Sequence, residues 1–578
     1  MVSVQNLSAD SLLAGLDEEQ RVAAESLLGP LCILAGAGTG KTRAITHRVA
    51  YGVATGVYSP SRVMALTFTA RAAAELRGRL RTLGAGGVAA RTFHASALSQ
   101  LSFFWPEVIG GTMPRILESK GRVIAHAADS LRMRLDTPTL RDLAAEIEWR
   151  KVSRLTLEQY AIAAPGRLLP ESLSVSAMVD LHRAYETVKD ERRQLDFEDV
   201  LLATAGMLET EPWVVQQVRE QYRFFVVDEY QDVSPLQQAL LELWLGERQD
   251  LCVVGDASQT IYSFAGASAD HLLGFQTRFP DATLVRLEQN YRSTAAIVGS
   301  ANQLMRDRAG SLTLRATARA GTRQTEPPVV AFRDDRSEAR AIAGQISDLI
   351  AAGTRAQDIA ILYRVNIQSA VLEQALTDAG VSYQLRGGKR FFDLPEVKQA
   401  LMMLKGASIA TTVEPLFKTV SDVLRSLGWT QDAPETRGAV RDRWETLNAI
   451  MGLAEAAPPE QKLREFSDEL YERSAGQHEP TMAAVTLATL HSAKGMEWDT
   501  VYVIGLNEGL LPISHAKTPA AIDEERRLLY VGVTRARQRL QLSWAETAPQ
   551  RSLKRLPSRF LEELRTRTRG AADTAPRG

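Results

Sequence analysis

The feature that most constrains this chain is the octapeptide AGAGTGKT at residues 35–42, which follows an apolar run and opens a helical pattern. A glycine-rich loop in that context points backbone N–H groups at one spot, where the helix dipole also favours negative charge. It is typical of a phosphate-binding loop, in which Lys41 reaches the β- and γ-phosphates and the Thr42 hydroxyl ligates Mg²⁺. The predicted nucleotide contacts of the loop are Ala35, Gly36, Ala37, Gly38, Thr39, Gly40, Lys41 and Thr42.

A second motif, VVDEYQD at residues 226–232, is an apolar run that ends in two carboxylates. Beside a phosphate loop, this pattern predicts that Asp228 holds Mg²⁺ through water and that Glu229 acts as general base on the attacking water. The competing interpretation is a solvated acidic turn without a catalytic role.

The rest of the chain alternates between two kinds of pattern. Residues 95–192 and 394–470 show almost only helical periodicity. Elsewhere, short apolar runs are bounded by turn residues and lead into helical patterns, which is typical of buried parallel strands in α/β layers. The clearest runs lie at 31–35, 63–68, 224–228, 251–256, 359–364 and 500–506. This order predicts two α/β sheet domains, each interrupted by a mainly helical insertion.

The composition of the chain excludes several other classes of protein. The chain has 68 Lys and Arg against 69 Asp and Glu, so any nucleic-acid site must be a local basic patch. Only two cysteines occur, which excludes a disulfide framework and a four-cysteine zinc site. No apolar run approaches the ~18 residues of a membrane span, and no signal-peptide profile opens the sequence. We therefore expect a soluble, cytoplasmic protein that does not interact with membranes.

Ten sequence blocks, in order, resemble superfamily 1A DNA helicases of the UvrD/PcrA/Rep type, and within them a short second UvrD-type paralogue of actinobacteria. The blocks are LDEEQR (16–21), ALTFTARAAAELRGRL (65–80), RTFHASAL (91–98), LDFEDVLL (195–202), VVDEYQDVSPLQ (226–237), VVGDASQTIYSFAGA (253–267), LEQNYRST (287–294), GGKRFFDLPEVKQAL (387–401), TLHSAKGMEWD (489–499) and EERRLLYVGVTRAR (524–537).

The resemblance implies two tandem RecA-like P-loop domains with parallel sheets, each carrying a helical insertion, and ATP with Mg²⁺ bound in the cleft between them. The expected segments are 1–94 with 193–285 for the first RecA-like domain, 95–192 for its insertion, 286–385 with 484–564 for the second RecA-like domain, 386–483 for a compact second insertion, and 565–578 for a flexible tail.

Several residues acquire nucleotide roles only through this resemblance. Gln20 is expected to read adenine, with Arg43 and Tyr291 flanking the base. Gln259 is expected to sense the γ-phosphate and to link the state of ATP to the DNA contacts.

The second RecA-like domain is expected to add three further groups. By resemblance, Arg292 and Arg535 are arginine fingers and Glu497 is a nucleotide contact. A planar guanidinium suits phosphate, and cations supplied by a second domain stabilise the charge that develops in phosphoryl transfer.

Aromatic residues at strand ends and in loops of these blocks can stack single-stranded bases without reading sequence. Each could instead be a core residue. We expect DNA contacts from Phe68, Thr92, His94, Tyr262, Phe264 and His491, and leave Phe93 and Phe197 open. The usual family pattern Trp-Arg-Gly-Ala reads Phe-Ala-Gly-Ala at 264–267, which makes the stacking platform smaller and removes a cation. Basic residues near the C-terminus could add backbone affinity or simply lie on a solvated helix face: Arg551, Lys554, Arg555 and Arg559.

The implied function is an ATP-dependent DNA helicase or translocase that moves 3′→5′ on single-stranded DNA, in repair or recombination. Expected partners are single-stranded DNA and single-to-double-strand junctions, with a repair protein or a second protomer as further candidates, in the nucleoid region of the cytoplasm. One alternative is a translocase that displaces proteins and unwinds duplex DNA poorly. The resemblance implies a Gly-Ile-Gly loop in the second insertion that contacts duplex DNA, but no such loop occurs in the short insertion of this chain. Leu427-Gly428-Trp429 is the nearest candidate.

Two further alternatives remain open. A nuclease–helicase component lacks support, since no nuclease motif follows Arg537. A non-hydrolysing DNA-binding scaffold is disfavoured by the intact Lys41, Glu229 and Arg535.

Overall fold

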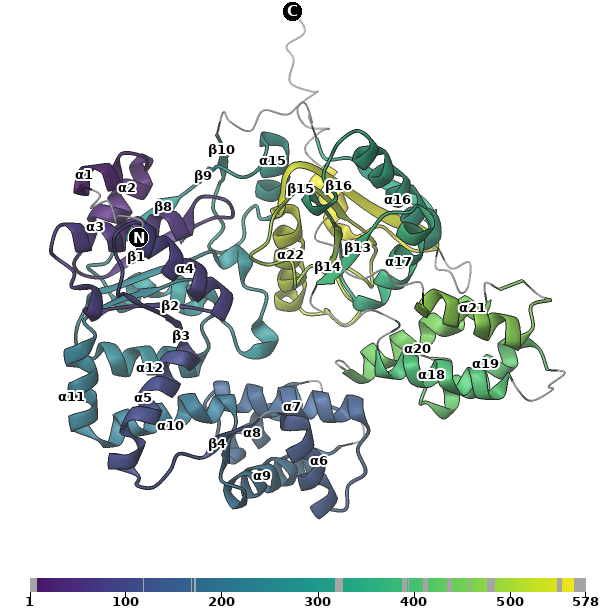
Figure 1. Cartoon of the computed structure of the whole chain (residues 1–578), viewed down its shortest axis with the longest axis horizontal. Helices are drawn as coiled ribbons and strands as arrows, with labels where there is room; N and C mark the ends of the chain where they lie inside the picture. The colour runs from purple at the N-terminus through teal and green to yellow at the C-terminus, as the bar shows by residue number, and fades with distance from the viewer. Residues whose placement is uncertain are drawn as a thin grey trace, which may run out of the picture. The chain divides into compact units, whose positions relative to one another are not determined.

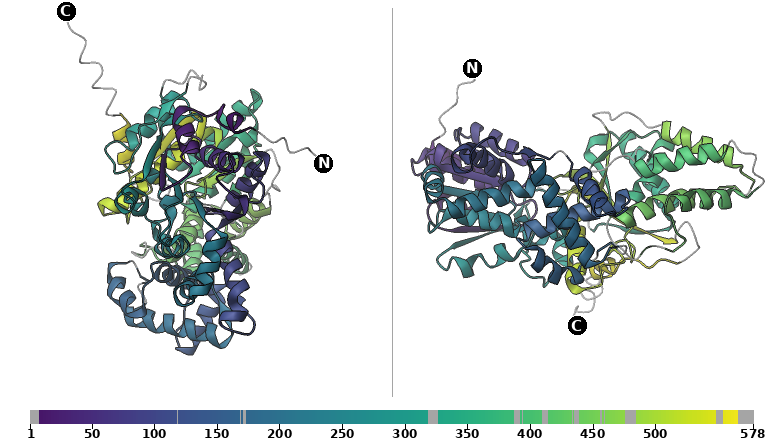
Figure 2. Two further views of the ribbon diagram at one scale, coloured as in Figure 1. Left: turned by 90° about the vertical axis from the view of Figure 1, so that its left-hand side faces the viewer. Right: turned by 90° about the horizontal axis from the view of Figure 1, so that it is seen from below.

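Two six-stranded parallel sheets organise the chain in the computed structural model of the protein (Figures 1 and 2). One unit comprises Met1–Tyr291 and Asp307–Arg315, and the other comprises Arg292–Arg306 and Ala316–Gly578. The structure describes residues 8–565 except 118, 168, 171–172, 318–325, 387–391, 393, 409–413, 433, 435–438, 456, 459, 476–483 and 548–553. Arg551, most of the GGKRFF segment and the expected tail after residue 565 therefore lie outside the described residues.

The first sheet has the strand order β3-β2-β6-β7-β1-β8, and its pairings are parallel. Strands β1, β2, β6 and β7, in the middle of the sheet, are buried on both faces, which explains their continuous apolar runs. Parallel strands end at one edge, so the residues that follow β1, β6 and β7 share that edge. The strands are β1 (Leu31–Ala35), β2 (Val63–Thr67), β3 (Ala89–Thr92), β6 (Phe224–Val227), β7 (Leu251–Gly255) and β8 (Thr283–Leu287).

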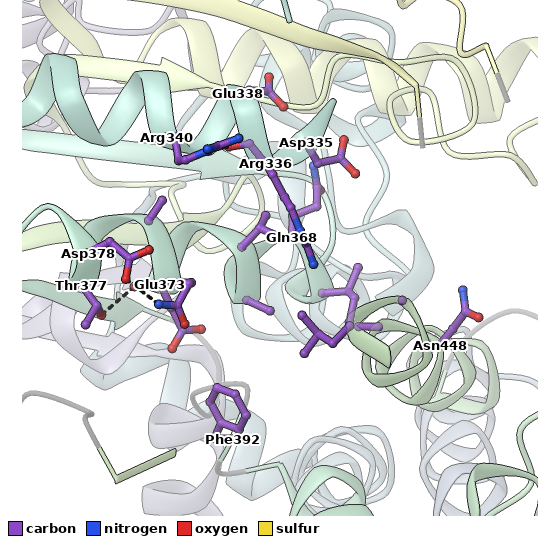
Figure 3. Close-up of a pocket in the computed structure, with 18 of the residues that line it drawn as sticks. Asp335, Arg336, Glu338, Arg340, Gln368, Glu373, Thr377, Asp378, Phe392 and Asn448 are labelled. Atoms are coloured by element: carbon purple, nitrogen blue, oxygen red, sulfur yellow. Dashed lines mark hydrogen bonds between the residues drawn. The ribbon is translucent and has the colours of Figure 1, made fainter. Parts of the chain in front are cut away.

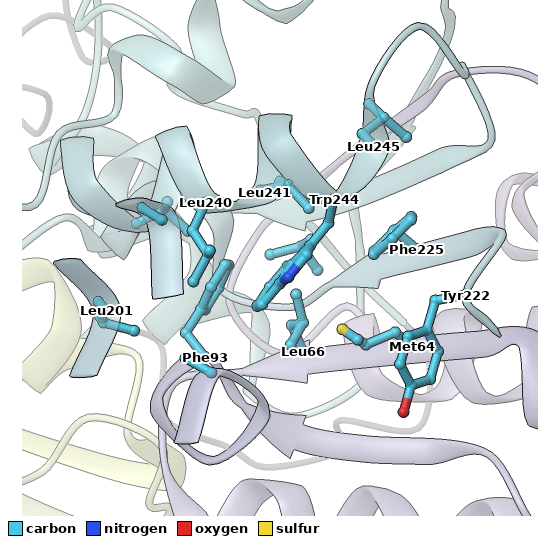
Figure 4. Close-up of a cluster of buried hydrophobic side chains, with 14 of the residues drawn as sticks. Met64, Leu66, Phe93, Leu201, Tyr222, Phe225, Leu240, Leu241, Trp244 and Leu245 are labelled. Atoms are coloured by element: carbon cyan, nitrogen blue, oxygen red, sulfur yellow. The ribbon is translucent and has the colours of Figure 1, made fainter. Parts of the chain in front are cut away.

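Helices cover both faces of this sheet (Figure 1). On one face, α2 (Glu18–Glu25), α3 (Lys41–Ala54) and α4 (Ala70–Thr82) form a core with the strands. The core of the other face surrounds the fully buried Trp244, whose indole donates to Gln100 Oε1 at 2.8 Å (Figure 4). It is built by α5 (Phe93–Val108), α10 (Phe197–Thr210), α11 (Pro212–Gln221) and α12 (Pro235–Leu245).

The limits of the first RecA-like domain differ from the expected ones. The helix α5 packs into the core of the sheet, although the expected insertion begins at residue 95, inside this helix. The strand β8 crosses residue 285 and pairs with β1, and the first unit continues to Tyr291. Sequence periodicity locates these elements, but only their packing assigns them to a unit.

The first insertion has its own apolar core and a buried ionic connection to α10. Lys151 Nζ and Lys189 Nζ lie 2.7 and 3.2 Å from Asp196 Oδ2, and the other oxygen of Asp196 caps the N-terminus of α10. The insertion consists mainly of α6 (Lys120–Ser130), α7 (Thr137–Val152), α8 (Leu157–Ala163) and α9 (Val175–Glu191).

The second sheet has the order β11-β16-β15-β12-β14-β13, again with parallel pairings. The helices α16 (Asp335–Ala351) and α17 (Ser369–Asp378) pack on one face, while α15 (Ala295–Leu304) and α22 (Pro519–Val533) contact the strands from the other (Figure 1). The strands are β11 (Val329–Asp334), β12 (Ile359–Tyr363), β13 (Tyr383–Arg386), β14 (Val485–Thr489), β15 (Trp498–Val503) and β16 (Ala536–Thr547). The predicted α/β fold with two parallel sheets is confirmed.

The second insertion is a bundle around one apolar core (Figure 2). Its helices are α18 (Pro395–Ala407), α19 (Leu416–Ser426), α20 (Ala439–Glu455) and α21 (Leu463–Ala475). Gly428 has a φ of 92° in the turn after α19, while Leu427 and Trp429 are only 7% and 6% exposed. The two apolar side chains of this turn therefore pack into the bundle core and do not form an apolar surface that could contact duplex DNA.

Candidate functional site

The phosphate loop joins β1 to α3 in the first unit. Gly38 and Gly40 have φ values of 73° and 83°, a left-handed conformation that favours glycine. The Thr39 hydroxyl donates to Gly36 O at 2.8 Å and closes the loop. A Cβ atom at Gly36 would lie 2.3 Å from Leu314 Cδ2, so a side chain here would displace that leucine. The loop is thus a tight backbone turn directly before a helix N-terminus, as the motif predicts.

The three predicted adenine contacts gather beside this loop. The Gln20 amide is buried and donates to Thr39 O at 2.9 Å. Arg43 Nη2 donates to Gly15 O at 2.5 Å, and the hydroxyl of Tyr291 donates to Asp17 Oδ2, also at 2.5 Å. The Tyr291 backbone N–H donates to Gly38 O at 2.9 Å, which ties this distant segment to the loop.

The predicted catalytic carboxylate meets the loop lysine. Lys41 Nζ lies 3.4 Å from Glu229 Oε1, with the two side chains 13% and 26% exposed. The adjacent Asp228 follows β6, and its Oδ1 accepts the Glu229 backbone N–H at 3.0 Å. Glu229 adopts φ 53° and ψ 43°, which is uncommon for a residue with a side chain and typical of functional sites. The motifs at 35–42 and 226–232 therefore form one polar centre.

A chain of hydrogen bonds links Glu229 to Gln259. Gln231 Nε2 donates to Glu229 Oε2 at 2.5 Å, and Gln231 Oε1 accepts the backbone N–H of Asp256 at 3.0 Å. The Asp256 carboxylate accepts from Gln259 Nε2 at 2.8 Å. Gln231, Asp256 and Gln259 are all buried, so each of these groups is held by its neighbour. The sequence indicated Gln259 but gave no role to Gln231.

The oxygens of Thr42 and Asp228 suit Mg²⁺, which prefers oxygen ligands and keeps several water molecules. In the part of the chain that the structure describes, no group of three His, Cys, Asp or Glu side chains could hold a metal ion. A site with one hydroxyl, one carboxylate, phosphate oxygens and water fits these residues. Cys32 and Cys252 are both buried free thiols.

Three aromatic rings of the first unit form a continuous surface. Phe68 stacks on Tyr262 with ring centroids 5.6 Å apart and planes 10° apart, and Tyr262 meets Phe264 edge-on at 6.1 Å. Phe68 and Phe264 are 44% and 60% exposed, and a contiguous group of exposed apolar side chains is typical of an interaction site. Gly266 has a φ of 86°, and a Cβ atom added at this position would lie only 2.8 Å from Val152 Cγ2. The end of α7 therefore packs closely against this loop.

The remaining aromatic candidates of this unit differ in how deeply their side chains are buried. Phe93 is 4% exposed and stacks on Trp244 in the core, so it does not contact DNA (Figure 4). Phe197 is 55% exposed and meets His94 edge-on at 6.0 Å. Burial, aided by Lys120, lowers the pKa of His94. The Thr92 hydroxyl accepts the Ala95 N–H at 3.1 Å and caps α5, while its O–H can still donate.

The second unit brings together Arg292, Arg535 and Glu497. Arg292 Nε lies 2.5 Å from Glu497 Oε2, and Arg292 Nη1 donates to Thr534 O at 3.2 Å. Arg535 is 2% exposed and donates to the carbonyl oxygens of Val531 and Met496 at 2.9 and 3.1 Å. Burial raises the pKa of Glu497, but the charges of Arg292 and Arg537 outweigh this and hold it below its usual range.

The predicted DNA contact of this unit, His491, is half-buried after β14. Burial, with Arg364 and Lys494 nearby, lowers the pKa of His491 to about 3, so the imidazole is neutral at pH 7. A neutral ring can stack on a base but adds no charge to phosphate binding.

Two of the C-terminal basic residues, Arg555 and Arg559, are paired with acidic groups. Arg555 Nη1 lies 2.5 Å from Asp335 Oδ1, and Arg559 Nη2 lies 2.8 Å from Glu508 Oε2. The expectation that these two arginines add backbone affinity for DNA is therefore not supported, since each guanidinium already neutralises a carboxylate.

A cavity of about 740 Å³ opens in the second unit beside α16, α17 and α20 (Figure 3). Its polar lining includes Asp335, Glu338, Arg340, Gln368 and Asn448. Arg555, which is paired with Asp335, is among its lining residues, but the other residues considered above for nucleotide or DNA binding are not.

Comparison with known proteins identifies the family. The family described as "UvrD/REP helicase N-terminal domain" matches residues 16–280, and the "UvrD-like helicase C-terminal domain" matches residues 285–431 and 430–547. Together these matches span most of the chain. The chain belongs to the UvrD/REP helicase family.

Curated relatives agree with this assignment. The chain is 47% identical to "ATP-dependent DNA helicase UvrD2" of Mycobacterium tuberculosis, over 99% of this chain and 84% of that protein. It is 29% identical to "ATP-dependent DNA helicase PcrA" of Bacillus subtilis, over 97% of this chain and 87% of the relative. It is also 29% identical to "DNA helicase II" of Escherichia coli, over 96% and 89%. None of the described helices is long and apolar enough to cross a membrane.

Proposed function

We propose that the protein is an ATP-dependent DNA helicase that translocates 3′→5′ on single-stranded DNA in repair or recombination. The observation that carries the ATPase part is the approach of Lys41 Nζ to Glu229 Oε1, 3.4 Å apart beside the phosphate loop, in a member of the UvrD/REP helicase family. The direction of movement and the role in repair rest on the family resemblance.

In this proposal, Lys41 and the loop N–H groups bind the triphosphate, and Glu229 accepts a proton from the attacking water. Thr42 and Asp228 would hold Mg²⁺, which when bound neutralises β- and γ-phosphate oxygens. Arg292 and Arg535 act on the same nucleotide from the second unit and stabilise the transition state. Gln20, Arg43 and Tyr291 bind the base, and Glu497 binds the nucleotide.

Coupling to DNA is proposed to run through Gln259. This residue is joined to Glu229 through Asp256 and Gln231, and it closely precedes in sequence the half-buried Tyr262 and the exposed Phe264. A change at the γ-phosphate would thereby reach the loop that grips bases. If grips in the two units alternate, each ATP cycle becomes one step along the strand.

The four-part domain organisation remains part of the proposal. Each RecA-like domain would supply one half of the motor, and the two insertions, near 95–192 and 386–483, would guide DNA. The packing of α5 and β8 supports including both elements in the first domain.

A second candidate function is a translocase that displaces proteins and unwinds duplex poorly without a partner protein or second protomer. The alignment with PcrA runs over 665 positions, more than the 578 residues of this chain, so the relative contains segments that this chain lacks. The burial of Leu427 and Trp429 favours this candidate too, because it removes the nearest substitute for a duplex-binding loop.

Three assays on the isolated monomer test both candidates: ATP hydrolysis, duplex unwinding and translocation on single-stranded DNA. ATP hydrolysis with and without single-stranded DNA should show strong DNA stimulation, and its absence would contradict the proposed motor. Single-turnover unwinding of 3′-tailed and 5′-tailed duplexes should favour the 3′ tail. Fast translocation with little unwinding identifies the second candidate, whereas similar yields of both show that the compact insertion is a sufficient duplex clamp.

A further inference from the structure

A third arginine, Arg537, lies beside the predicted arginine fingers and has no assigned role. It is the second residue of β16, and its Nη2 lies 2.6 Å from Glu497 Oε1. Its Nη1 lies 3.4 Å from Asp499 Oδ1. The Arg537 carbonyl oxygen also accepts the backbone N–H of Thr294 at 3.0 Å, so the residue joins the segment of Arg292 to that of Glu497.

The two carboxylate oxygens of Glu497 have different partners. Arg292 Nε binds Oε2, whereas Arg537 Nη2 binds Oε1. The side chains of Glu497, Arg292 and Arg537 are 35%, 20% and 40% exposed, so Arg292 is the most enclosed of the three. Arg292 can therefore leave the carboxylate without disturbing the contact that Arg537 makes.

The pairing of Glu497 with two different arginines affects how Arg292 can act as an arginine finger. To reach a phosphate, Arg292 must give up Glu497, which would leave a partly buried carboxylate unpaired close to an anionic nucleotide. An unpaired charge in such a place is costly. A second guanidinium on the other oxygen reduces that cost and keeps the carboxylate in place.

We propose that Arg537 is a positioning residue of the nucleotide site, which keeps Glu497 oriented and charge-paired while Arg292 exchanges from that carboxylate to a nucleotide phosphate. The proposal rests on the proposed function, since it assumes that Arg292 acts on ATP. It adds a residue that touches neither nucleotide nor DNA.

The test is a double-mutant cycle on the full chain, read as kcat and KM of DNA-stimulated ATP hydrolysis. We expect Arg537→Ala to lower kcat about 10-fold, which corresponds to about 1.4 kcal/mol of activation free energy, with a smaller change in KM for ATP. In a Glu497→Gln background, where no carboxylate retains Arg292, adding Arg537→Ala should change kcat less than about twofold. Arg537→Lys should recover part of the loss, because an ammonium can still reach one carboxylate oxygen.

Arg539→Ala is the matched control, since Arg539 lies exposed on the same strand and should retain wild-type kcat. If Arg537→Ala lowers the thermal unfolding midpoint, Arg537→Gln, which keeps a donor but no charge, replaces it in the cycle. Wild-type kcat in the Arg537 variant, or an undiminished loss in the Glu497→Gln background, overturns the positioning role and leaves the proposed function intact. A wild-type protein without DNA-stimulated hydrolysis overturns both.

Discussion

The two units hold their predicted nucleotide residues in different environments. In the first unit, Lys41 and Glu229 face each other with partly exposed side chains, 13% and 26%. In the second unit, Arg535 is 2% exposed and donates to backbone carbonyls, and Arg292 is paired with Glu497. The first pair lies directly beside the phosphate loop, whereas the arginines are held by backbone carbonyls and by Glu497. In the proposed function, the first unit therefore supplies binding and chemistry, and the second unit adds an acceleration that requires its arginines to change partners.

The largest effect should come from the first unit. Lys41→Ala should abolish ATP hydrolysis, because the lysine supplies the charge that meets the β- and γ-phosphates. Binding of single-stranded DNA should remain, since the ring surface of Phe68, Tyr262 and Phe264 belongs to other loops. Hydrolysis assays and fluorescence anisotropy with an oligonucleotide measure the two activities. Arg183→Ala, on an exposed face of α9, serves as control. Loss of both activities together would show that the two sites are not separate.

The next effect should come from the second unit. Arg535→Ala or Arg292→Ala should lower kcat by ~10³ with a modest change in ATP affinity, as expected for groups that act mainly in the transition state. Arg535→Lys should recover little, because an ammonium cannot reproduce the planar guanidinium. Steady-state kinetics and equilibrium nucleotide binding give the two quantities. Wild-type turnover in either alanine variant would remove that arginine from the proposed mechanism and weaken the comparison.

A smaller effect should appear at the link between nucleotide and DNA in the first unit. Gln259→Ala should reduce the stimulation of ATPase by DNA about 10-fold while reducing basal ATPase less, consistent with a coupling free energy between two sites. The reason is that Gln259 is anchored to Asp256 and lies beside the aromatic loop. Gln249→Ala, an exposed glutamine of the same unit, should leave both rates unchanged. An equal loss of basal and stimulated rates would mean that Gln259 serves only the nucleotide.

The smallest effect concerns the folding stability of the first unit and its dependence on pH. His182 is fully buried against Tyr160, and neither ring nitrogen has a hydrogen-bond partner among the described residues. Burial, with Arg150 and Lys151 nearby, lowers the pKa of His182 from 6.5 to about 3. Between these values the unfolded chain binds a proton that the folded chain excludes, so stability falls as the pH decreases below 6.5.

Replacing this histidine tests the argument. His182→Leu should raise the stability of the unit by roughly 1–3 kcal/mol, because an unsatisfied buried polar group is removed. It should also flatten the decline in the thermal midpoint between pH 7 and pH 5. His126→Leu, at an exposed site on α6, is the control and should follow the wild-type curve. A wild-type pH slope in the His182 variant would contradict the assignment.

Local sequence patterns predicted a large part of this fold. The apolar runs at 31–35, 63–68, 224–228, 251–256, 359–364 and 500–506 coincide with strands to within three residues at either end. The strand-to-helix context of AGAGTGKT predicted a phosphate loop, and the structure contains the expected turn at Gly38 and Gly40. These features are local: periodicity, glycine φ values and chain direction act within a few residues, so they can be read from neighbours in sequence.

Burial and partner choice were decided only by the tertiary structure. Phe93 and Phe197 both begin helices and look equivalent in sequence, yet Phe93 packs on Trp244 while Phe197 remains exposed. The role of Gln231 and the contact of Arg537 with Glu497 likewise depend on groups far away along the chain or in another loop. No local pattern encodes such contacts, because they arise when the order of strands in a sheet brings separate loops to one edge. Sequence thus determined which elements form, and packing decided which side chains meet.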